Sequence, residues 1–304
     1  MKIYVSQPIV EPSTSDILAG HEVVFGDASV QGEALAAAVA DADAIIGTPP
    51  VRITAAVLAA ARRLKVVANC AVGTDNVDLD ACRARGIVVT NTPGVLTDAT
   101  ADLAFALILA LARRLREAEA VARSGSWDGW KPTELLGVSL AGKTLGVYGM
   151  GRIGAAVARR AEAFGMKVLG MVDGDPEEAF FRLLETSDFV TIHVPLTPAT
   201  RGRFGRAELS RMRPGAFLVN TARGPVVDGD ALLEALESGR LRGAGLDVYP
   251  EEPRIDPRLL GRDDVVLLPH VGSATEETRL AMARTACAEA ARVLAGAPPV
   301  HRVA

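Results

Sequence analysis

Several features that define large protein classes are missing from this chain of 304 residues. Its 33 lysines and arginines are outnumbered by 37 acidic residues, which leaves a formal charge of −4 and no basic surplus to hold a nucleic-acid backbone. The longest strongly apolar stretch, residues 104–112, is far shorter than the roughly 20 residues that a membrane span needs. We therefore expect neither nucleic acid nor a membrane as a partner.

Cysteine is also scarce. Cys70, Cys82 and Cys287 are an odd and scattered set without a CxxC pair, so the sequence encodes neither a disulfide framework nor a zinc site. The chain does not open with the charged region and apolar segment of a secretory signal. These absences favour a reduced, cytoplasmic setting.

What the chain does have is a regular rhythm of short β-branched runs and longer Ala/Leu/Arg-rich amphipathic stretches. This rhythm predicts repeated βα units around parallel sheets, which is an α/β fold. Apolar residues make up 49% and charged residues 23%, as in ordinary globular proteins. The length corresponds to two domains of roughly 150 residues each.

The rhythm is interrupted once, near the middle of the chain. One long helix is predicted over residues 98–122, followed by a looser segment that holds both tryptophans, and a second βα series begins at Lys143. Pro/Gly-rich hinges are expected at residues 92–94 and 272–275. The second series is therefore predicted to be an inserted domain, residues 95–275, within a first domain made of residues 1–94 and 276–304.

A glycine-rich turn opens the second series. Gly149, Gly151 and Gly154 form a GxGxxG between a predicted strand, residues 144–148, and a predicted helix. Backbone N–H groups of such a turn can approach a pyrophosphate, and the helix N-terminus adds a favourable dipole. Asp173 ends the next predicted strand, where a carboxylate can accept hydrogen bonds from ribose hydroxyls. The pattern predicts a dinucleotide site, with NAD favoured because the acid would repel a 2′-phosphate.

Three side chains suited to hydride-transfer chemistry follow later strands of the same series. Arg223 lies in a glycine-flanked turn, and its planar, permanently charged guanidinium suits a carboxylate. His270 directly follows a predicted strand and can exchange a proton near neutral pH. Glu252 lies in a proline-rich loop. A carboxylate beside an imidazole favours the charged form of the imidazole and orients the ring. Ligands bind at the carboxyl edge of open parallel sheets, so we expect the three groups to meet there.

The order of five motifs resembles that of the D-isomer-specific 2-hydroxyacid dehydrogenases. The motifs are GMGRIG (149–154), HVPLT (193–197), NTARG (220–224), DVYPEEP (247–253) and PHVGSAT (269–275). In the first domain, NCAVGTDNVD (69–78) resembles the family's substrate loop, and RGIVVTNTPG (85–94) resembles the strand and hinge that follow it. The resemblance implies a discontinuous flavodoxin-like substrate domain and an inserted Rossmann domain that binds NAD(P), each built on a doubly wound parallel sheet.

The resemblance also implies roles for individual residues. Arg223 would bind the substrate carboxylate and carbonyl, His270 would donate the proton in reduction, and Glu252 would pair with His270. The backbone amides of Val72 and Gly73 would hold the carboxylate. The residues implied to line the cofactor are Thr100, Gly149, Gly151, Arg152, Ile153, Gly154, Asp173, His193, Val194, Pro195, Thr200, Thr221, Ala222, Asp247 and Gly272.

Within the family, residues 123–137 are most similar to the glyoxylate/hydroxypyruvate reductase branch. This implies NAD(P)H-dependent reduction of a small 2-oxo acid to the D-2-hydroxy acid by a homodimer formed through the Rossmann domain. Trp130 would reach the partner's active site, or serve only as an interface aromatic. Two alternatives stay open: a phosphite or other-acid dehydrogenase on the same scaffold, and an NAD-sensing, corepressor-like binding protein.

The chain departs from the family pattern where the adenosine ribose would be read. Val172 takes the usual acidic position, and Asp173 comes one residue later. The stretch from residue 173 to 188 is also short, as if a small strand and part of a helix were missing. NADP therefore stays possible as the cofactor beside NAD.

Overall fold

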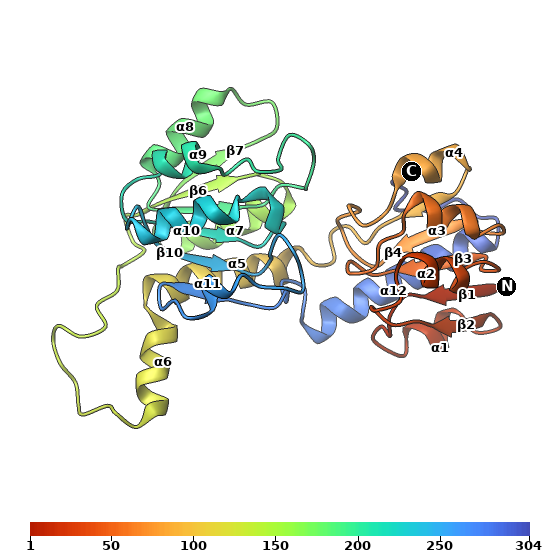
Figure 1. Ribbon diagram of the computed structural model, residues 1–304, viewed down its shortest axis with the longest axis horizontal. Coiled ribbons are helices and arrows are strands. Elements are labelled where there is room, and N and C mark those ends of the chain that lie inside the picture. Colours follow the sequence, from red (N-terminus) through yellow and green to blue (C-terminus); the bar gives the residue numbers. More distant parts are fainter. The chain divides into compact units, whose positions relative to one another are not determined.

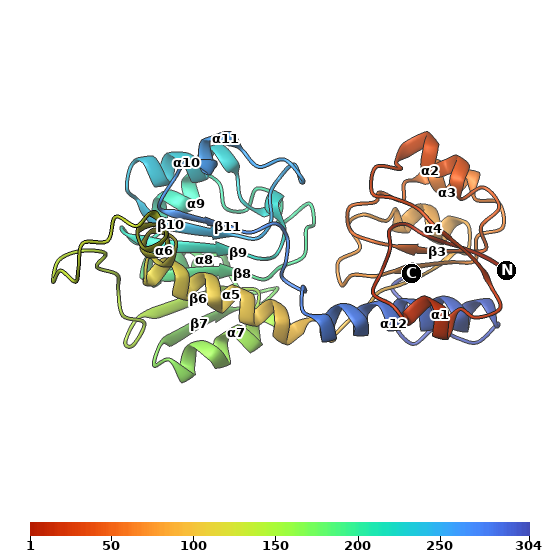
Figure 2. The same cartoon turned by 90° about the horizontal axis from the view of Figure 1, so that it is seen from below.

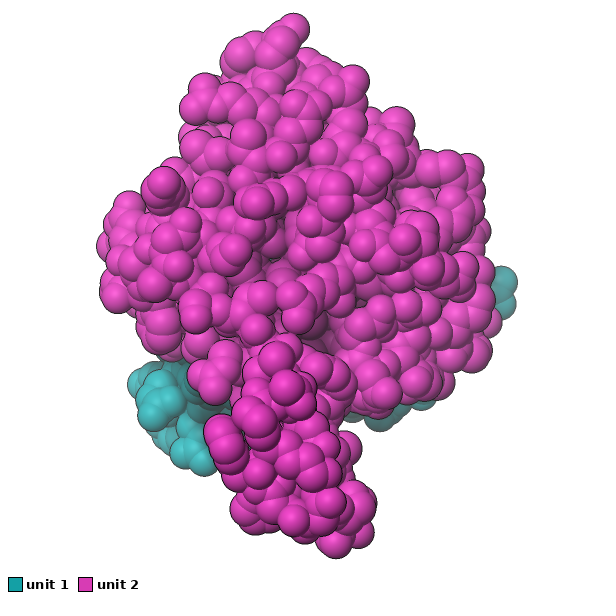
Figure 3. All heavy atoms as spheres, turned by 90° about the vertical axis from the view of Figure 1, so that its left-hand side faces the viewer, with its two compact units in different colours: residues 1–96, 273–304 teal, residues 97–272 magenta.

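The computed structural model describes all residues from 1 to 304 and divides into two compact units, each with its own sheet. Unit 1 consists of residues 1–96 and 273–304, and unit 2 of residues 97–272, as coloured in Figure 3. Every strand pair in both sheets is parallel. The predicted α/β class with two parallel sheets is therefore confirmed.

Unit 1 has a five-stranded sheet with the order β2-β1-β3-β4-β5. Figure 2 shows α2 and α3 on one face of this sheet, and α1 and α12 on the other. The strands are β1 (Lys2–Val5), β2 (Glu22–Phe25), β3 (Ala44–Gly47), β4 (Val66–Asn69) and β5 (Val88–Thr90). The helices are α1 (Ser13–Ile17), α2 (Gly32–Ala38), α3 (Ala55–Ala60), α4 (Leu79–Ala84) and α12 (Glu276–Leu294).

Unit 2 has a six-stranded sheet with the order β11-β10-β9-β8-β6-β7; β6, β7 and β10 are labelled in Figure 1, and the other strands in Figure 2. Its strands are β6 (Thr144–Tyr148), β7 (Lys167–Met171), β8 (Phe189–Ile192), β9 (Ala216–Asn220), β10 (Leu241–Leu246) and β11 (Val265–Leu267). Its helices are α5 (Thr97–Ala112), α6 (Leu115–Ser124), α7 (Arg152–Ala163), α8 (Glu177–Thr186), α9 (Arg206–Arg211), α10 (Gly229–Glu237) and α11 (Pro257–Leu260), with a 3₁₀ turn at Gly224–Val226.

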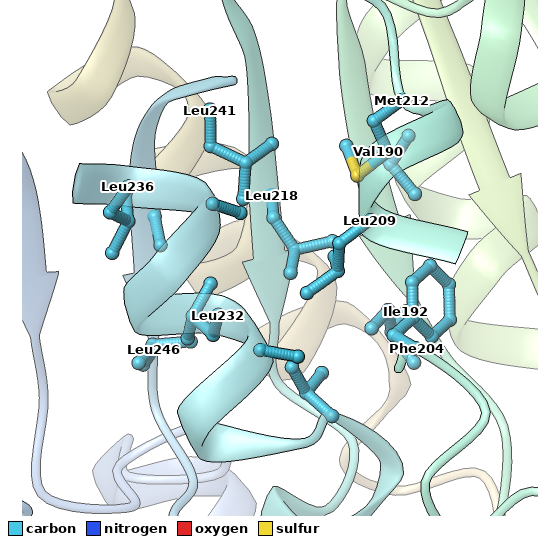
Figure 4. Close-up of a cluster of buried hydrophobic side chains, with 14 of the residues drawn as sticks. Val190, Ile192, Phe204, Leu209, Met212, Leu218, Leu232, Leu236, Leu241 and Leu246 are labelled. Atoms are coloured by element: carbon cyan, nitrogen blue, oxygen red, sulfur yellow. The ribbon is translucent and has the colours of Figure 1, made fainter. Parts of the chain in front are cut away.

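Two apolar layers hold this sheet in place because alternate strand residues point to opposite faces. Leu218 and Ile192 pack against Leu232 and Leu209 of α10 and α9, as Figure 4 shows. Phe217 and its neighbours on the other face pack against α5 and α7. Burying each large side chain fully contributes roughly 1.5–3 kcal/mol, so the carboxyl ends of the strands are held on a rigid support.

The prediction of one helix over residues 98–122 is wrong. The structure has two helices, because Arg114 adopts a left-handed backbone conformation with φ of 52° between α5 and α6. The αL conformation cannot continue an α-helix, and the chain changes direction there. As a result α6 and the segment after it project from the rest of unit 2, which is visible at the bottom of Figure 3.

Each sheet has one point at which the strand order reverses. In unit 2 it lies between β6 and β8, and in unit 1 between β1 and β3. In open α/β sheets, ligands bind outside the carboxyl ends of the strands at such a point. Ligands are therefore expected beside the loops that follow β6, β8, β1 and β3.

Candidate active site

The loops after β10 and β11 bring a carboxylate and an imidazole together. Glu252 Oε2 lies 2.7 Å from His270 Nδ1. The other carboxylate oxygen of Glu252 accepts a hydrogen bond of 2.9 Å from the backbone N–H of Tyr249. The side chains of His270 and Glu252 are 37% and 35% exposed, so the pair is anchored on one side and accessible on the other. Nδ1 of the imidazole is thus engaged by Glu252, while Nε2 has no partner within the chain.

Asp247 fixes the loop that presents His270. Its two carboxylate oxygens accept hydrogen bonds from the backbone N–H groups of Val271 (2.7 Å) and Gly272 (2.8 Å), and the side chain is fully buried. His270 itself has a φ of 56°, which is unusual for a residue with a Cβ. Such strain, on the order of 1–3 kcal/mol, persists only where surrounding contacts impose it, and it is concentrated at functional sites.

Arg223 enters the same sheet edge from the end of β9. The side chain of Asn220 closes the turn, with Nδ2 donating to the carbonyl of Arg223 (2.9 Å) and Oδ1 accepting from the N–H of Ala222 (3.0 Å). Gly224 then packs directly on the loop that leads to Glu252: a Cβ at this position would lie 1.9 Å from the carbonyl carbon of Tyr249. The arginine turn and the glutamate loop are thus in contact.

The surroundings of Glu252 favour its charged form. Burial raises the pKa of Glu252, but the hydrogen bond and charge of His270, the Tyr249 N–H and the charge of Arg223 outweigh it, and the pKa is lowered overall. Glu252 is therefore a carboxylate throughout the neutral range. Asp247 has the opposite balance, because burial outweighs its two backbone hydrogen bonds and raises its pKa.

The turn after β6 has the geometry of a phosphate cradle. Gly149 has a φ of 103°, and a Cβ there would lie 2.6 Å from the carbonyl oxygen of His193, at the reversal point of the sheet. A Cβ on Gly154 would lie 2.1 Å from the carbonyl oxygen of Gly149, so the helix can pack this closely on the turn only with glycine. A Cβ on Gly151 would meet nothing within 4 Å, which leaves its backbone open to a ligand at the start of α7.

A second group of predicted cofactor residues lies around the ends of β9 and β10. The hydroxyl oxygen of Thr221 is buried without a hydrogen-bond partner, which is costly unless a ligand supplies one. A Cβ on Gly272 would lie 3.1 Å from Asp247 Oδ2 and 3.5 Å from Thr100 Cγ2, so these three residues are neighbours. The glycine cradle and the orphaned hydroxyl both fit a dinucleotide that lies across the carboxyl edge of the sheet.

The loop after β8 carries the remaining predicted contacts. His193 Nε2 lies 2.8 Å from the hydroxyl of Thr191, and burial lowers the pKa of His193 to about 3, so this imidazole is neutral. The hydroxyl of Thr200 donates to the carbonyl of Pro195 (2.6 Å) and shapes the loop from within. Arg152 and Ile153 are the first residues of α7, Val194 follows His193, and Ala222 lies in the Arg223 turn.

Three further predicted substrate contacts lie on other segments of the chain. Val72 and Gly73 belong to unit 1, in the loop after β4. Trp130 is 82% exposed in the segment after α6. Thr100 at the start of α5 is beside Gly272, and α5 extends 16 residues, or about 24 Å, before α6 begins. Within one chain, the structure does not bring Trp130 to His270.

Two residues outside the predicted set, Asn220 and Tyr249, also build the site. Asn220 shapes the turn of Arg223, as described above. The hydroxyl of Tyr249 donates to the carbonyl of Leu268 (2.8 Å), and its N–H holds Glu252, so this residue ties the β10 loop to the end of β11. Both lie inside the NTARG and DVYPEEP motifs, which was the available signal.

Comparison with known proteins agrees with this arrangement. Residues 105–272 match the family model described as D-isomer specific 2-hydroxyacid dehydrogenase, NAD binding domain. The chain is 49% identical over 259 residues to a glyoxylate reductase of Thermococcus litoralis, which covers 81% of this chain and 78% of the relative. It is 46% identical over 297 residues to a glyoxylate reductase of Korarchaeum cryptofilum, which covers 93% and 89%.

The chain belongs to the D-isomer-specific 2-hydroxyacid dehydrogenases. It is an oxidoreductase of the NAD(P)-binding type, which favours the enzyme over the corepressor-like alternative. Among solved structures, an NADPH-dependent glyoxylate/hydroxypyruvate reductase of Sinorhizobium meliloti in complex with NADP and malonate is similar, with a TM-score of 0.88 and 35% identity over 100% of this chain and 96% of that one.

A D-lactate dehydrogenase of Aquifex aeolicus complexed with NAD and lactic acid is also similar. Its TM-score is 0.87 at 29% identity, over 97% of this dehydrogenase and 96% of that chain. Both nicotinamide cofactors thus occur among the neighbours. None of the helices in this dehydrogenase combines the length and apolar character that a bilayer span requires.

Proposed function

We propose that this dehydrogenase reduces glyoxylate, hydroxypyruvate or a similar small 2-oxo acid to the D-2-hydroxy acid. The observation that carries the proposal is the 2.7 Å Glu252–His270 pair beside the Arg223 turn, on the sheet edge that also holds the glycine cradle. Bound NAD(P)H supplies the hydride. Names of the relatives, which include glyoxylate and glyoxylate/hydroxypyruvate reductases, support the choice of substrate.

Each residue then has a defined task. Arg223 binds the carboxylate and polarises the carbonyl, so that its oxygen can accept negative charge. His270 donates a proton from Nε2 to that oxygen and takes it back in the reverse reaction. Glu252 holds Nδ1, orients the ring and stabilises its charged form. The backbone N–H groups of Val72 and Gly73 hold the substrate carboxylate from unit 1.

A panel of 2-oxo acids assayed with NADH and NADPH tests the proposal. We expect rapid cofactor oxidation with glyoxylate or hydroxypyruvate, and formation of the D-isomer where the product is chiral. Phosphite with NAD is the matched assay for the alternative substrate. Turnover of phosphite, without turnover of any 2-oxo acid, would replace the proposed function with that alternative.

The Glu252→Gln variant tests the pairing. The amide has the size of the carboxylate but lacks the charge that stabilises the protonated imidazole. Reduction needs that proton, so kcat/KM for reduction should fall off at a lower pH than in the unmodified enzyme. Superimposable pH profiles would contradict the role. Glu251→Gln is the control, because that carboxylate pairs with Arg254 (2.8 Å) in the same loop and should leave the profile unchanged.

The cofactor is NAD in this proposal, and Asp173 selects it. After β7 the chain makes a tight turn in which Asp175 Oδ2 accepts a hydrogen bond of 2.8 Å from the N–H of Val172, and Gly174 has a φ of 89°. Asp175 is thereby engaged within the turn, while Asp173 is exposed at its corner. Its carboxylate can accept from ribose hydroxyls and would repel a 2′-phosphate.

Binding titrations with the Asp173→Ala variant test this selection. The ratio of the NADPH to the NADH dissociation constant should fall by about fivefold, since one repulsive charge contact costs on the order of 1 kcal/mol. Intrinsic fluorescence or calorimetry measures both constants without turnover. Glu178→Ala removes a nearby exposed carboxylate on α8 and should leave the ratio unchanged. An unchanged ratio in the Asp173 variant would refute the assignment.

The active form is a homodimer in this proposal, formed through unit 2. None of the residues of α6 is buried, although the helix and the segment after it carry Leu115, Trp127, Trp130 and Leu136, which are 51–82% exposed. Apolar surface of this extent is typical of an interaction site. Sedimentation at micromolar concentration should give twice the mass of one chain, which is 31.8 kDa.

We place the enzyme in the cytoplasm, where its three free and buried thiols would stay reduced. Cell fractionation checks this location.

A further inference from the structure

The reversal point of the unit 1 sheet carries a hydrogen-bonded polar chain. Ser6 follows β1 and Thr48 follows β3, and their hydroxyl oxygens lie 2.9 Å apart in a buried setting. The backbone N–H of Thr48 donates to Ser6 Oγ (2.9 Å). Thr48 Oγ1 lies 2.6 Å from Gln7 Oε1. In open parallel sheets, ligands bind outside the carboxyl ends of the strands at a reversal point of this kind.

The directions of these hydrogen bonds follow from the chemistry of the groups. Ser6 Oγ accepts from the Thr48 N–H, so its own proton goes to Thr48 Oγ1, and Thr48 passes its proton to Gln7. A separation of 2.6 Å is that of an O–H···O bond, shorter than the usual N–H···O distance. The carbonyl end of the Gln7 amide is therefore held by Thr48. Its NH₂ end has no hydrogen-bond partner within the protein and the residue is partly exposed, so two donors remain for a ligand.

A second set of contacts connects this amide to the proposed carboxylate-binding loop. Asn76 Nδ2 donates to the carbonyl of Thr48 (3.2 Å), and the side-chain amides of Asn76 and Asn69 bind each other reciprocally at 3.1 Å. Asn69 Nδ2 then donates to the carbonyl of Gly73 (2.8 Å). Asn69 is fully buried and Asn76 nearly so, which makes this connection rigid.

The placement suits an acid longer than glyoxylate. The Gln7 amide is held from the end of β3, and the Val72–Gly73 loop follows β4, the neighbouring strand of the sheet. An acid whose carboxylate lies at Val72 and Gly73 can therefore extend its third carbon toward the end of β3. Glyoxylate has no third carbon, and the methyl group of pyruvate cannot accept a hydrogen bond.

We infer that Gln7 is a specificity-determining residue that reads an oxygen on the third carbon of the substrate. The inference rests on the proposed function and narrows it to 3-hydroxy-2-oxo acids, of which hydroxypyruvate is the simplest. The Gln7 NH₂ group donates a hydrogen bond to the substrate hydroxyl, while Thr48 keeps the amide from turning over. Gln7 takes no part in the hydride or proton transfer.

The experiment compares kcat/KM for hydroxypyruvate, pyruvate and glyoxylate in the unmodified enzyme and in Gln7→Leu. Loss of one hydrogen bond to a neutral group should lower the hydroxypyruvate value by about five- to tenfold, with glyoxylate and pyruvate within twofold. Equal losses on all three acids, or no loss on any, would overturn the inference. A wild-type enzyme that reduces none of them would instead remove the proposed function, and the inference with it.

A second variant keeps the test independent of packing. Gln7→Glu retains the oxygen that Thr48 binds and replaces only the outward NH₂ group. Its added charge acts on all three acids, so the ratio of hydroxypyruvate to pyruvate is the readout, and it should fall by at least fivefold. An unchanged ratio would overturn the inference. Gln31→Leu is the control: the side chain of Gln31, the other glutamine of the chain, binds the backbone at Ala28, Pro50 and Arg52, and its loss should leave the ratio unchanged.

Discussion

Replacement of His270 by glutamine should lower kcat for 2-oxo acid reduction by about 100-fold or more, the usual loss when a general acid is removed. Glutamine can still hydrogen-bond to Glu252, so the loop and the buried Asp247 contacts with Val271 and Gly272 stay in place. What disappears is the group that delivers a proton to the developing alkoxide. Steady-state kinetics with saturating substrate and cofactor measure the change.

The chain provides a matched control for this variant. His301 Nδ1 lies 3.0 Å from Glu289 Oε1, so it is also an imidazole paired with a carboxylate, but it belongs to the end of unit 1. His301→Gln should leave kcat of the folded enzyme within twofold. A His270→Gln enzyme that retains kcat within threefold of wild type would refute the proton-donor role. An equal loss in both variants would show that the effect is structural.

The main features of this site were predictable because they depend on local chemistry and strand order. Arg223, Asp247 and His270 each come within a few residues after a strand, and β9, β10 and β11 are neighbours in the sheet. Carboxyl ends of parallel strands share one edge, so residues distant in sequence had to converge. The need for glycine at position 154 was also predictable, because the tight turn between strand and helix leaves no room for a Cβ there.

Features that depend on tertiary contacts were not predictable in the same way. Nothing in the local sequence of residues 98–122, which are rich in alanine and leucine, marks the left-handed Arg114 that separates α5 from α6. Strand β2 has only a weak signal in the sequence, because its side chains are at most partly buried at the sheet edge. The role of Asn220 became visible only when its two bonds to the Arg223 turn were known.

The loop after β1 illustrates the limit most clearly. Gln7 stands in a short polar stretch before Pro8, and no motif of the sequence distinguishes it. The role inferred for Gln7 depends on the pairing of β1 with β3, which places this residue beside Thr48, 41 residues away along the chain. Side chains that select a substrate depend on such pairings, whereas the groups that perform the chemistry follow the motifs.

Arg223→Ala should reduce kcat/KM for 2-oxo acids by about 1,000-fold. Hydrogen bonds to a charged group contribute roughly 1.5–3 kcal/mol each, and the guanidinium fork can make two to a carboxylate or carbonyl oxygen. Asn220 holds the turn through the backbone of Ala222 and Arg223, so truncation of the side chain leaves the loop in place. We expect KM to rise strongly and kcat to fall as well, because the same cation stabilises charge on the carbonyl oxygen in the transition state.

Arg223→Lys separates charge from geometry. Lysine restores the positive charge but not the planar fork, so it should recover only part of the loss, about 10-fold of the 1,000. Arg201→Ala, at an exposed position of the same unit, is the control and should leave kcat/KM unchanged. An Arg223→Ala enzyme with unaltered KM and kcat would contradict the assignment. Full recovery by lysine would mean that Arg223 acts only as a point charge, and that orientation of the acid depends on the amides of Val72 and Gly73.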